Sequence, residues 1–166
     1  MKTVFFNRHA KSDWSNYGLR DFDRPLNKRG LRDSPNMGRR LKLREEKIDL
    51  FISSPANRAI STARLMAHNY GYDESSIVEI KTLYLPGISS FVEVLDELDD
   101  RINSVILFAH NPGITEVVEY FTETDLVNIP TCGIAKVVFL EAESWKEVSR
   151  GTGHLAYFDF PKKDFQ

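Results

Sequence analysis

The apolar run Thr3-Val4-Phe5-Phe6 is followed, one residue later, by Arg8-His9-Ala10. Such a run near the start of a chain predicts the first buried strand of an α/β protein. In open α/β sheets, residues at the carboxyl ends of the strands form the crevice where ligands bind. An imidazole beside a guanidinium at that place therefore predicts a histidine nucleophile in an anion-binding pocket.

Further apolar runs follow along the chain and alternate with segments that have the pattern of amphipathic helices. These runs are Phe51-Ile52, Ile77 to Ile80, Val105 to Phe108, Ala135 to Leu140 and Leu155 to Phe160. Strands that alternate with helices indicate βαβ units and a mostly parallel sheet. We therefore expect an α/β fold.

Length and composition narrow the class of protein. A chain of 166 residues and 19.1 kDa fits one domain spanning residues 1–166, and its net charge of -2 gives no electrostatic reason to expect nucleic acid or an anionic membrane as a partner. The chain has no apolar stretch near the roughly 20 residues of a membrane span. The first residues, Met1-Lys2-Thr3, lead into a predicted strand rather than a signal peptide. Cys132 is the single cysteine of the sequence and cannot form an internal disulfide. We expect a cytoplasmic protein.

A strongly basic helix is predicted before Ile48. Its apolar residues Met37, Leu41 and Leu43 are interpreted as one buried stripe. The basic residues are then expected to form a solvated outer face rather than a nucleic-acid site. They are Arg39, Arg40, Lys42 and Arg44.

Two more predicted strands end in residues suited to binding an anion. The segment from Ser53 to Ala63 enters a helix through Pro55, which suits a first helical turn and places Arg58 beside free backbone N–H groups. His110 follows the run that ends at Phe108. Each residue alone is more often structural or solvated. Their occurrence at successive strand ends predicts one shared pocket.

These motifs resemble those of the histidine phosphatase superfamily, which also contains the phosphoglycerate mutases. The resemblance covers nearly the whole chain and is carried by Arg8-His9, by Arg58 within its Ser-Ser-Pro segment, and by His110. It implies a three-layer α/β/α fold of the phosphoglycerate mutase type. Within the superfamily the chain is similar to the small SixA-type phosphohistidine phosphatases, through residues 8–14 and 23–30 and, more weakly, 151–161.

The resemblance implies phosphoryl transfer in two steps. His9 would attack phosphorus, and water would then hydrolyse the phosphoenzyme. The groups that would bind the phosphoryl oxygens are Arg8, Arg58 and His110. The resemblance to the small phosphatases suggests Arg24 as a further cation. His9 must be neutral, so its other ring nitrogen is expected to donate to an acceptor such as a backbone carbonyl. His110 can be cationic when phosphate is bound.

The chain departs from the larger family where a general acid is expected. Residues 82–87, after the third predicted strand, contain no carboxylate, and Asn111 stands where the acid phosphatase branch has an aspartate. We take Asn111 as a substrate-binding candidate, and Asp13, Asp23 and Glu79 as alternative donors that are more often caps or surface groups. General-acid assistance is typically worth about 10²–10⁴-fold. Its absence favours phosphohistidine, whose imidazole can leave as a neutral molecule.

The short segments between elements favour an open pocket. It would admit a phosphorylated histidine on a partner protein, such as a phosphotransfer domain, or a small phosphoester. Residues 16–27 either contact such a partner or pack beneath their own loop. Two alternatives stay open, a phosphomonoesterase for small molecules and a non-enzymatic module that binds phosphorylated groups.

No metal and no cofactor are expected. His68 and His154 lack partners at metal-ligand spacing and are interpreted as structural or surface residues. Cys132 has no neighbouring motif that would activate it and is expected to be a buried, inert thiol. Residues 151–153, Gly-Thr-Gly, lack the length and the lysine of a phosphate-binding loop and predict a turn.

Overall fold

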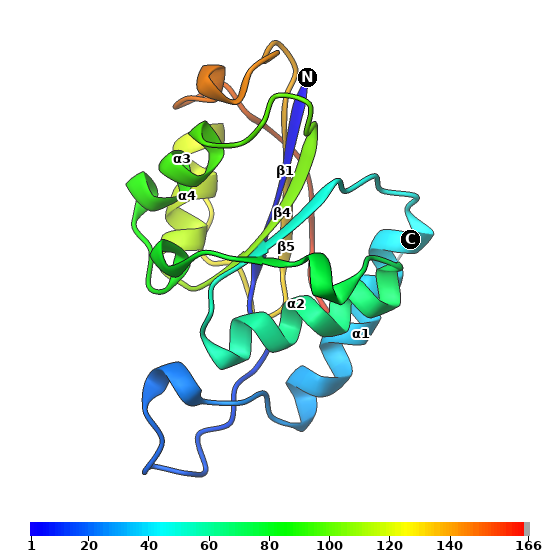
Figure 1. Cartoon of the computed structure of the whole chain (residues 1–166), viewed down its shortest axis with the longest axis vertical. Coiled ribbons are helices and arrows are strands. Elements are labelled where there is room, and N and C mark those ends of the chain that lie inside the picture. The colour runs from blue at the N-terminus through cyan, green and yellow to red at the C-terminus, as the bar shows by residue number, and fades with distance from the viewer. Residues whose placement is uncertain (165–166) are drawn as a thin grey trace.

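A six-stranded sheet forms the centre of the computed structural model, which describes residues 1–164 (Figure 1). The strand order is β3-β2-β4-β1-β5-β6, in which β3, β2, β4 and β1 are parallel, β5 is antiparallel to β1, and β6 is antiparallel to β5. The expectation of a mostly parallel sheet is therefore confirmed. The strands are β1 (Lys2–Arg8), β2 (Leu50–Ser53), β3 (Val78–Glu79), β4 (Ser104–Ala109), β5 (Ile134–Phe139) and β6 (His154–Asp159).

Helices cover both faces of the sheet. Two pack together on one face, α1 (Lys28–Leu43) and α2 (Asn57–Tyr70), and two cover the other, α3 (Ile88–Asp96) and α4 (Gly113–Thr122) (Figure 1). This arrangement confirms the three-layer α/β/α fold. Short 3-10 turns connect the elements: η1 (Asp21–Asp23), η2 (Glu74–Ser76), η3 (Lys81–Leu83) and η4 (Trp145–Glu147).

The alternation of side chains along β1 creates two hydrophobic cores. Phe5 packs in the core beneath α1 and α2, whereas Val4 and Phe6 pack in the core beneath α3 and α4. Successive side chains of a strand point to opposite faces, so the centre of a strand covered on both faces is apolar at consecutive positions. This explains the apolar run that begins the chain.

The sheet aligns the carboxyl ends of β1, β2 and β4. Arg8 pairs with Ala109, and Ser53 pairs with Phe108. The register continues past the strands, because the N–H of His9 donates to the carbonyl of Ala109 at 3.0 Å and that of Ser54 to Phe108 at 2.9 Å. The residues that follow these strands therefore lie at one edge of the sheet.

Helix α1 differs from its predicted pattern. Arg40 is buried and pairs with Asp159 of β6 at 2.8 Å, while Leu43 is 69% exposed. The expectation of a fully solvated basic face is wrong at Arg40, because β6 and the residues after it cover that side of the helix. Leu43 lies only two positions after Leu41, about 200° around the helix, and so cannot share its face.

The third predicted strand is shorter than expected. Only Val78 and Glu79 of the run from Ile77 to Ile80 join the sheet, and both are exposed at its edge. The predicted turn at residues 151–153 is present, with Gly151 at a φ of 71°. In the part of the chain that the structure describes, no helix is both long and apolar enough to cross a membrane.

Candidate active site

His9 follows β1 and has the tautomer that a nucleophile needs. Its Nδ1 lies 2.7 Å from the carbonyl oxygen of Ala10. Because a carbonyl only accepts, Nδ1 carries the proton and Nε2 keeps its lone pair. Burial lowers the pKa of His9 to about 4, and the charges of Arg58 and Arg8 contribute to the decrease. The ring is therefore neutral near pH 7, and the expected contact with a backbone carbonyl is confirmed.

His110 follows β4 and lies beside His9, with 5.2 Å between the ring centroids. Its Nε2 is 2.7 Å from the hydroxyl of Ser54, whereas Nδ1 is buried and has no hydrogen-bond partner among residues 1–164. Burial lowers the pKa of His110 to about 3, assisted by the nearby His9 and Arg58. The ring is neutral without a bound anion, and Nδ1 is available to bind one.

Arg58 lies in the first turn of α2, as predicted, although the helix begins at Asn57 and Pro55 precedes it. The guanidinium donates from Nη1 to the backbone carbonyl of Asp21 at 2.7 Å and from Nη2 to its carboxylate at 3.0 Å. Thr62 fixes this turn to the nucleophile loop, because its hydroxyl donates to the carbonyl of Arg58 and accepts from the N–H of Ala10.

Arg8 completes the group of four predicted residues. Its Nη1 donates to the carbonyl of Ile129 at 2.9 Å, and burial lowers the pKa of its guanidinium. The positive charge of Arg8 lowers the pKa of both His9 and His110. The structure therefore brings Arg8, His9, Arg58 and His110 to one edge of the sheet.

Asp21 and Tyr84 join these residues and were missed by the sequence reasoning. Asp21 lies in η1, and its Oδ2 accepts hydrogen bonds from the hydroxyl of Tyr84 at 2.7 Å and from Arg58. The ring of Tyr84 meets that of His110 edge-on at 5.5 Å. Burial raises the pKa of Asp21, but these two hydrogen bonds outweigh burial and hold the pKa below its ordinary value.

The comparisons with known proteins agree with this arrangement. The model of the histidine phosphatase superfamily (branch 1) matches residues 4–83. A structure from Agrobacterium tumefaciens that bears the name phosphohistidine phosphatase SixA is 27% identical, with a TM-score of 0.80 over 96% of this chain and 98% of that one. Residues 4–83 thus match the histidine phosphatase superfamily, and the chain as a whole has the fold of the SixA structure. The predicted family and fold are thus confirmed.

Two other relatives of this histidine phosphatase extend the comparison. A structure of the protein histidine phosphatase SixA complexed with tungstate has a TM-score of 0.81 at 23% identity, covering 96% of this chain and 97% of that one. An uncharacterised protein of Mycobacterium tuberculosis is 29% identical over 165 residues, covering 93% of this chain and 99% of that protein. The similarity extends over almost the whole phosphatase chain in both cases.

The alternative proton donors of this phosphatase have other partners. Asp13 accepts from the N–H of Ser15, Asp23 pairs with Arg20 at 2.8 Å, and Glu79 is exposed on the edge strand β3. These contacts agree with the interpretation of the three residues as a cap, an ion-pair partner and a surface group.

Arg24 and Asn111, the further substrate-binding candidates, also have contacts within the phosphatase. Arg24 lies beneath the ring of Trp14, 4.0 Å from its centroid, and is 7% exposed. The amide of Asn111 donates to Asn128 and accepts from the hydroxyl of Thr115. Both residues are thus held by neighbouring loops, and their roles in binding stay predictions.

The remaining candidates have no catalytic surroundings, although the backbone N–H of Cys132 donates to the carbonyls of Arg8 and His9 at 3.1 Å. Cys132 is buried, and burial raises the pKa of its thiol to about 12, as expected for an inert group. His68 is an exposed neighbour of Glu74, and His154 is exposed on β6. No group of three or more metal-ligating side chains occurs within residues 1–164.

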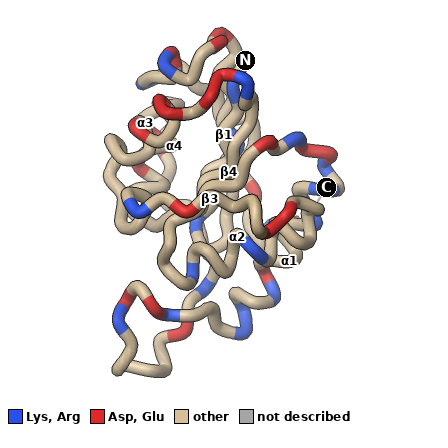
Figure 2. The backbone as a smooth tube through the Cα atoms, viewed as in Figure 1, with Lys and Arg blue, Asp and Glu red and all other residues tan. Residues whose placement is uncertain are grey.

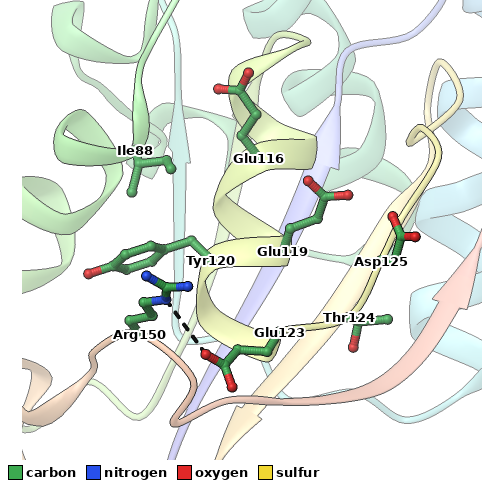
Figure 3. A pocket seen from close by; sticks show the side chains of 8 residues that line it. All are labelled: Ile88, Glu116, Glu119, Tyr120, Glu123, Thr124, Asp125 and Arg150. Carbon is green, nitrogen blue, oxygen red and sulfur yellow. Dashed lines mark ion pairs between the residues drawn. The ribbon is translucent and has the colours of Figure 1, made fainter.

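An acidic cavity of about 570 Å³ lies beside α4 (Figure 3), and neither His9 nor His110 lines it. Its lining includes Glu116, Glu119, Glu123 and Asp125, and Glu123 pairs with Arg150 at 3.6 Å. Figure 2 shows further acidic residues along α3, in contrast to the basic residues of α1. Carboxylates repel phosphate, and the lining of this cavity includes none of Arg8, His9, Arg58 and His110.

A second groove of about 530 Å³ does reach the phosphatase site. Its lining includes Arg8 and Asn111 together with Glu116 and Glu119 of α4. The exposed Val127 forms part of its wall. At Arg8, the edge of the sheet where the predicted site residues lie therefore borders a surface groove.

Proposed function

We propose that this phosphatase removes phosphoryl groups from phosphorylated histidine side chains of proteins, through a phosphoenzyme formed at His9. The observation that carries the proposal is the 2.7 Å contact between Nδ1 of His9 and the carbonyl of Ala10. It leaves the lone pair of Nε2 to attack phosphorus while the bond from phosphorus to the substrate nitrogen breaks. Water then releases phosphate from His9. Dividing one displacement into two in this way is covalent catalysis.

The surrounding cations would stabilise the transferring phosphoryl group. Arginine has five N–H donors, and the contacts with Asp21 occupy only some of those of Arg58. The free Nδ1 of His110 supplies another donor, and a bound phosphate would favour its protonated form. Arg8 adds a further positive charge. Such donors lower the barrier most when they are already in place before the reaction.

The surroundings of Asp21 favour a phosphohistidine over a phosphoester. An alkoxide leaving group needs a proton, yet the pKa of Asp21 lies below its ordinary value, so this carboxyl group is ionised near pH 7. Imidazole with a proton on its other nitrogen leaves as a neutral molecule and needs no acid. The relatives named SixA support the same substrate class.

The shape of the site supports a protein substrate. The groove between Arg8 and α4 is open, and the aromatic side chains of Trp14 and Tyr17 are exposed on the loop that precedes η1. We expect a histidine on the surface of a partner, for example a phosphotransfer domain, to approach His9 from this side. No cofactor enters this scheme.

The test is single-turnover transfer from a ³²P-labelled histidine phosphotransfer protein, beside hydrolysis of p-nitrophenyl phosphate. We expect fast loss of protein-bound label, slow ester hydrolysis, and loss of both in His9→Ala. Turnover of small esters alone would instead identify a small-molecule phosphomonoesterase. Binding of the phosphorylated protein without turnover that depends on His9 would identify a phospho-binding module.

A further inference from the structure

The two carboxylate oxygens of Asp21 have different surroundings. Oδ2 accepts from Tyr84 and from Arg58, at 2.7 and 3.0 Å. No residue among 1–164 donates a hydrogen bond to Oδ1, and the side chain is 42% exposed. One oxygen thus holds the carboxylate in place, and the other is free to interact with water.

The carboxylate is also fixed relative to the phosphoryl site. The backbone carbonyl of Asp21 accepts from Arg58, and the amide of Asn57 donates to the backbone carbonyl of Asp23 at 3.1 Å. These contacts attach η1 to the first turn of α2. The negative charge of Asp21 raises the pKa of both His9 and His110, so it acts on both rings of the site.

We propose that Asp21 accepts the proton of the water molecule that hydrolyses the phosphoenzyme. The inference rests on the proposed function, because it concerns the second step at His9. The water oxygen bonds to phosphorus, and its proton passes to Oδ1 of Asp21. The bond between phosphorus and Nε2 breaks, and its electron pair stays on Nε2. The products are phosphate, neutral His9 and protonated Asp21, which returns its proton to solvent.

The direction of proton transfer follows from the state of the carboxyl group. A carboxylate held ionised by Tyr84 and Arg58 is a poor acid but is ready to accept a proton when water attacks. The first step does not need this group, because a protonated imidazole leaving group requires no acid. Asp21 therefore assists the breakdown of the phosphoenzyme more than its formation.

The test uses Asp21→Asn, which keeps a carbonyl oxygen for Tyr84 and Arg58 but cannot take up the proton. The labelled enzyme is formed with ³²P-phosphoramidate, a small compound with a phosphorus–nitrogen bond, and trapped by alkaline quenching. We expect formation at a rate similar to that of the wild type and breakdown slower by about 10²–10⁴-fold, the usual range for general-base catalysis. The phosphoenzyme should then accumulate.

The matched control is Asp23→Asn, which removes a carboxylate from the same turn. Asp23 pairs with the exposed Arg20 and should leave both steps unchanged. Breakdown of Asp21→Asn at the wild-type rate would overturn the inference, and so would equal slowing of both steps, which would make Asp21 a positioning residue for Arg58. A wild-type enzyme without phosphate on His9 would instead refute the proposed function.

Discussion

His9 and His110 both carry their proton on Nδ1, but their neighbours occupy opposite nitrogens of the two rings. The carbonyl of Ala10 can only accept, so it fixes the proton of His9 on Nδ1 and frees Nε2. The hydroxyl of Ser54 can donate to Nε2 of His110, which leaves the proton on Nδ1. One ring is thereby suited to attack phosphorus, and the other to donate to a phosphoryl oxygen.

This arrangement predicts the effect of Ser54→Ala. Removing the hydroxyl leaves the buried Nε2 of His110 without its partner, which should lower the free energy of unfolding by about 1–3 kcal/mol. Turnover should fall about tenfold if about 1.4 kcal/mol of tautomer preference is lost. Urea denaturation and steady-state kinetics with phosphoramidate measure the two effects.

The control for Ser54→Ala is Ser61→Ala, whose hydroxyl donates to Asn57 on the partly exposed side of α2. Ser61→Ala should change neither the free energy of unfolding nor the turnover by much. Unchanged turnover in Ser54→Ala would show that the tautomer of His110 is set by another group.

At the scale of elements, a buried ion pair joins α1 to β6. Arg40 binds the carboxylate of Asp159 at 2.8 Å and also donates to the carbonyls of Phe160 and Pro161. Removing one member of such a pair leaves the other buried and poorly compensated, at a typical cost of about 3–5 kcal/mol. We expect Arg40→Ala to lose about 3 kcal/mol of unfolding free energy, since Arg44 also lies 3.6 Å from Asp159.

Chemical denaturation of Arg40→Ala beside Arg39→Ala checks this expectation. Arg39 is exposed on the same helix and contacts only the side chain of Asn69 among the hydrogen bonds of residues 1–164. Its removal should cost less than about 0.5 kcal/mol. Similar losses in the two variants would mean that the Arg40 pair contributes no more than a surface contact.

The packing of α1 on α2 depends on Gly38. A Cβ atom at this position would lie 2.5 Å from the carbonyl oxygen of Met66, which belongs to the backbone of α2 and cannot move alone. Gly38→Ala should therefore separate the helices and cost about 1–3 kcal/mol, as overpacked cores do. Gly87→Ala, where a Cβ has no atom within 4 Å, is the matched control in thermal unfolding. Equal melting temperatures for the two variants would contradict the close approach.

At the scale of the whole molecule, the buried histidines make stability depend on pH. Burial holds the pKa of His9 at about 4 and that of His110 at about 3, against 6.5 for an ordinary histidine. The unfolded chain therefore binds more protons between pH 6.5 and these values, and stability must fall as the pH decreases through that window. Each histidine should contribute up to about 1.4 kcal/mol per pH unit.

Urea denaturation at pH 7.0 and 5.5 measures this effect in the wild type and in His9→Asn/His110→Asn. The wild type should lose more stability than the double variant over this interval. Added inorganic phosphate should reduce the loss, because a bound anion favours the protonated rings. An identical pH dependence in both proteins would show that the histidines are not buried as neutral groups.

The sequence by itself determined the sheet and the placement of its polar ends. Parallel strands covered on both faces have continuous apolar runs, and their carboxyl ends meet at one edge. Arg8, His9 and His110 could thus be assigned to one site, together with Arg58 in the turn after β2. The pattern of α1 was less reliable, because it could not show that β6 covers Arg40.

Only the tertiary structure decided the position of Asp21 and Tyr84. Asp21 lies in a segment without helical or strand periodicity, and two further aspartates, Asp13 and Asp23, occur in the same stretch. Its selection depends on hydrogen bonds to Arg58 and Tyr84, 37 and 63 residues away in the chain. Periodic elements reveal their buried faces in the local sequence, whereas an irregular loop is placed by contacts that form only when distant segments meet.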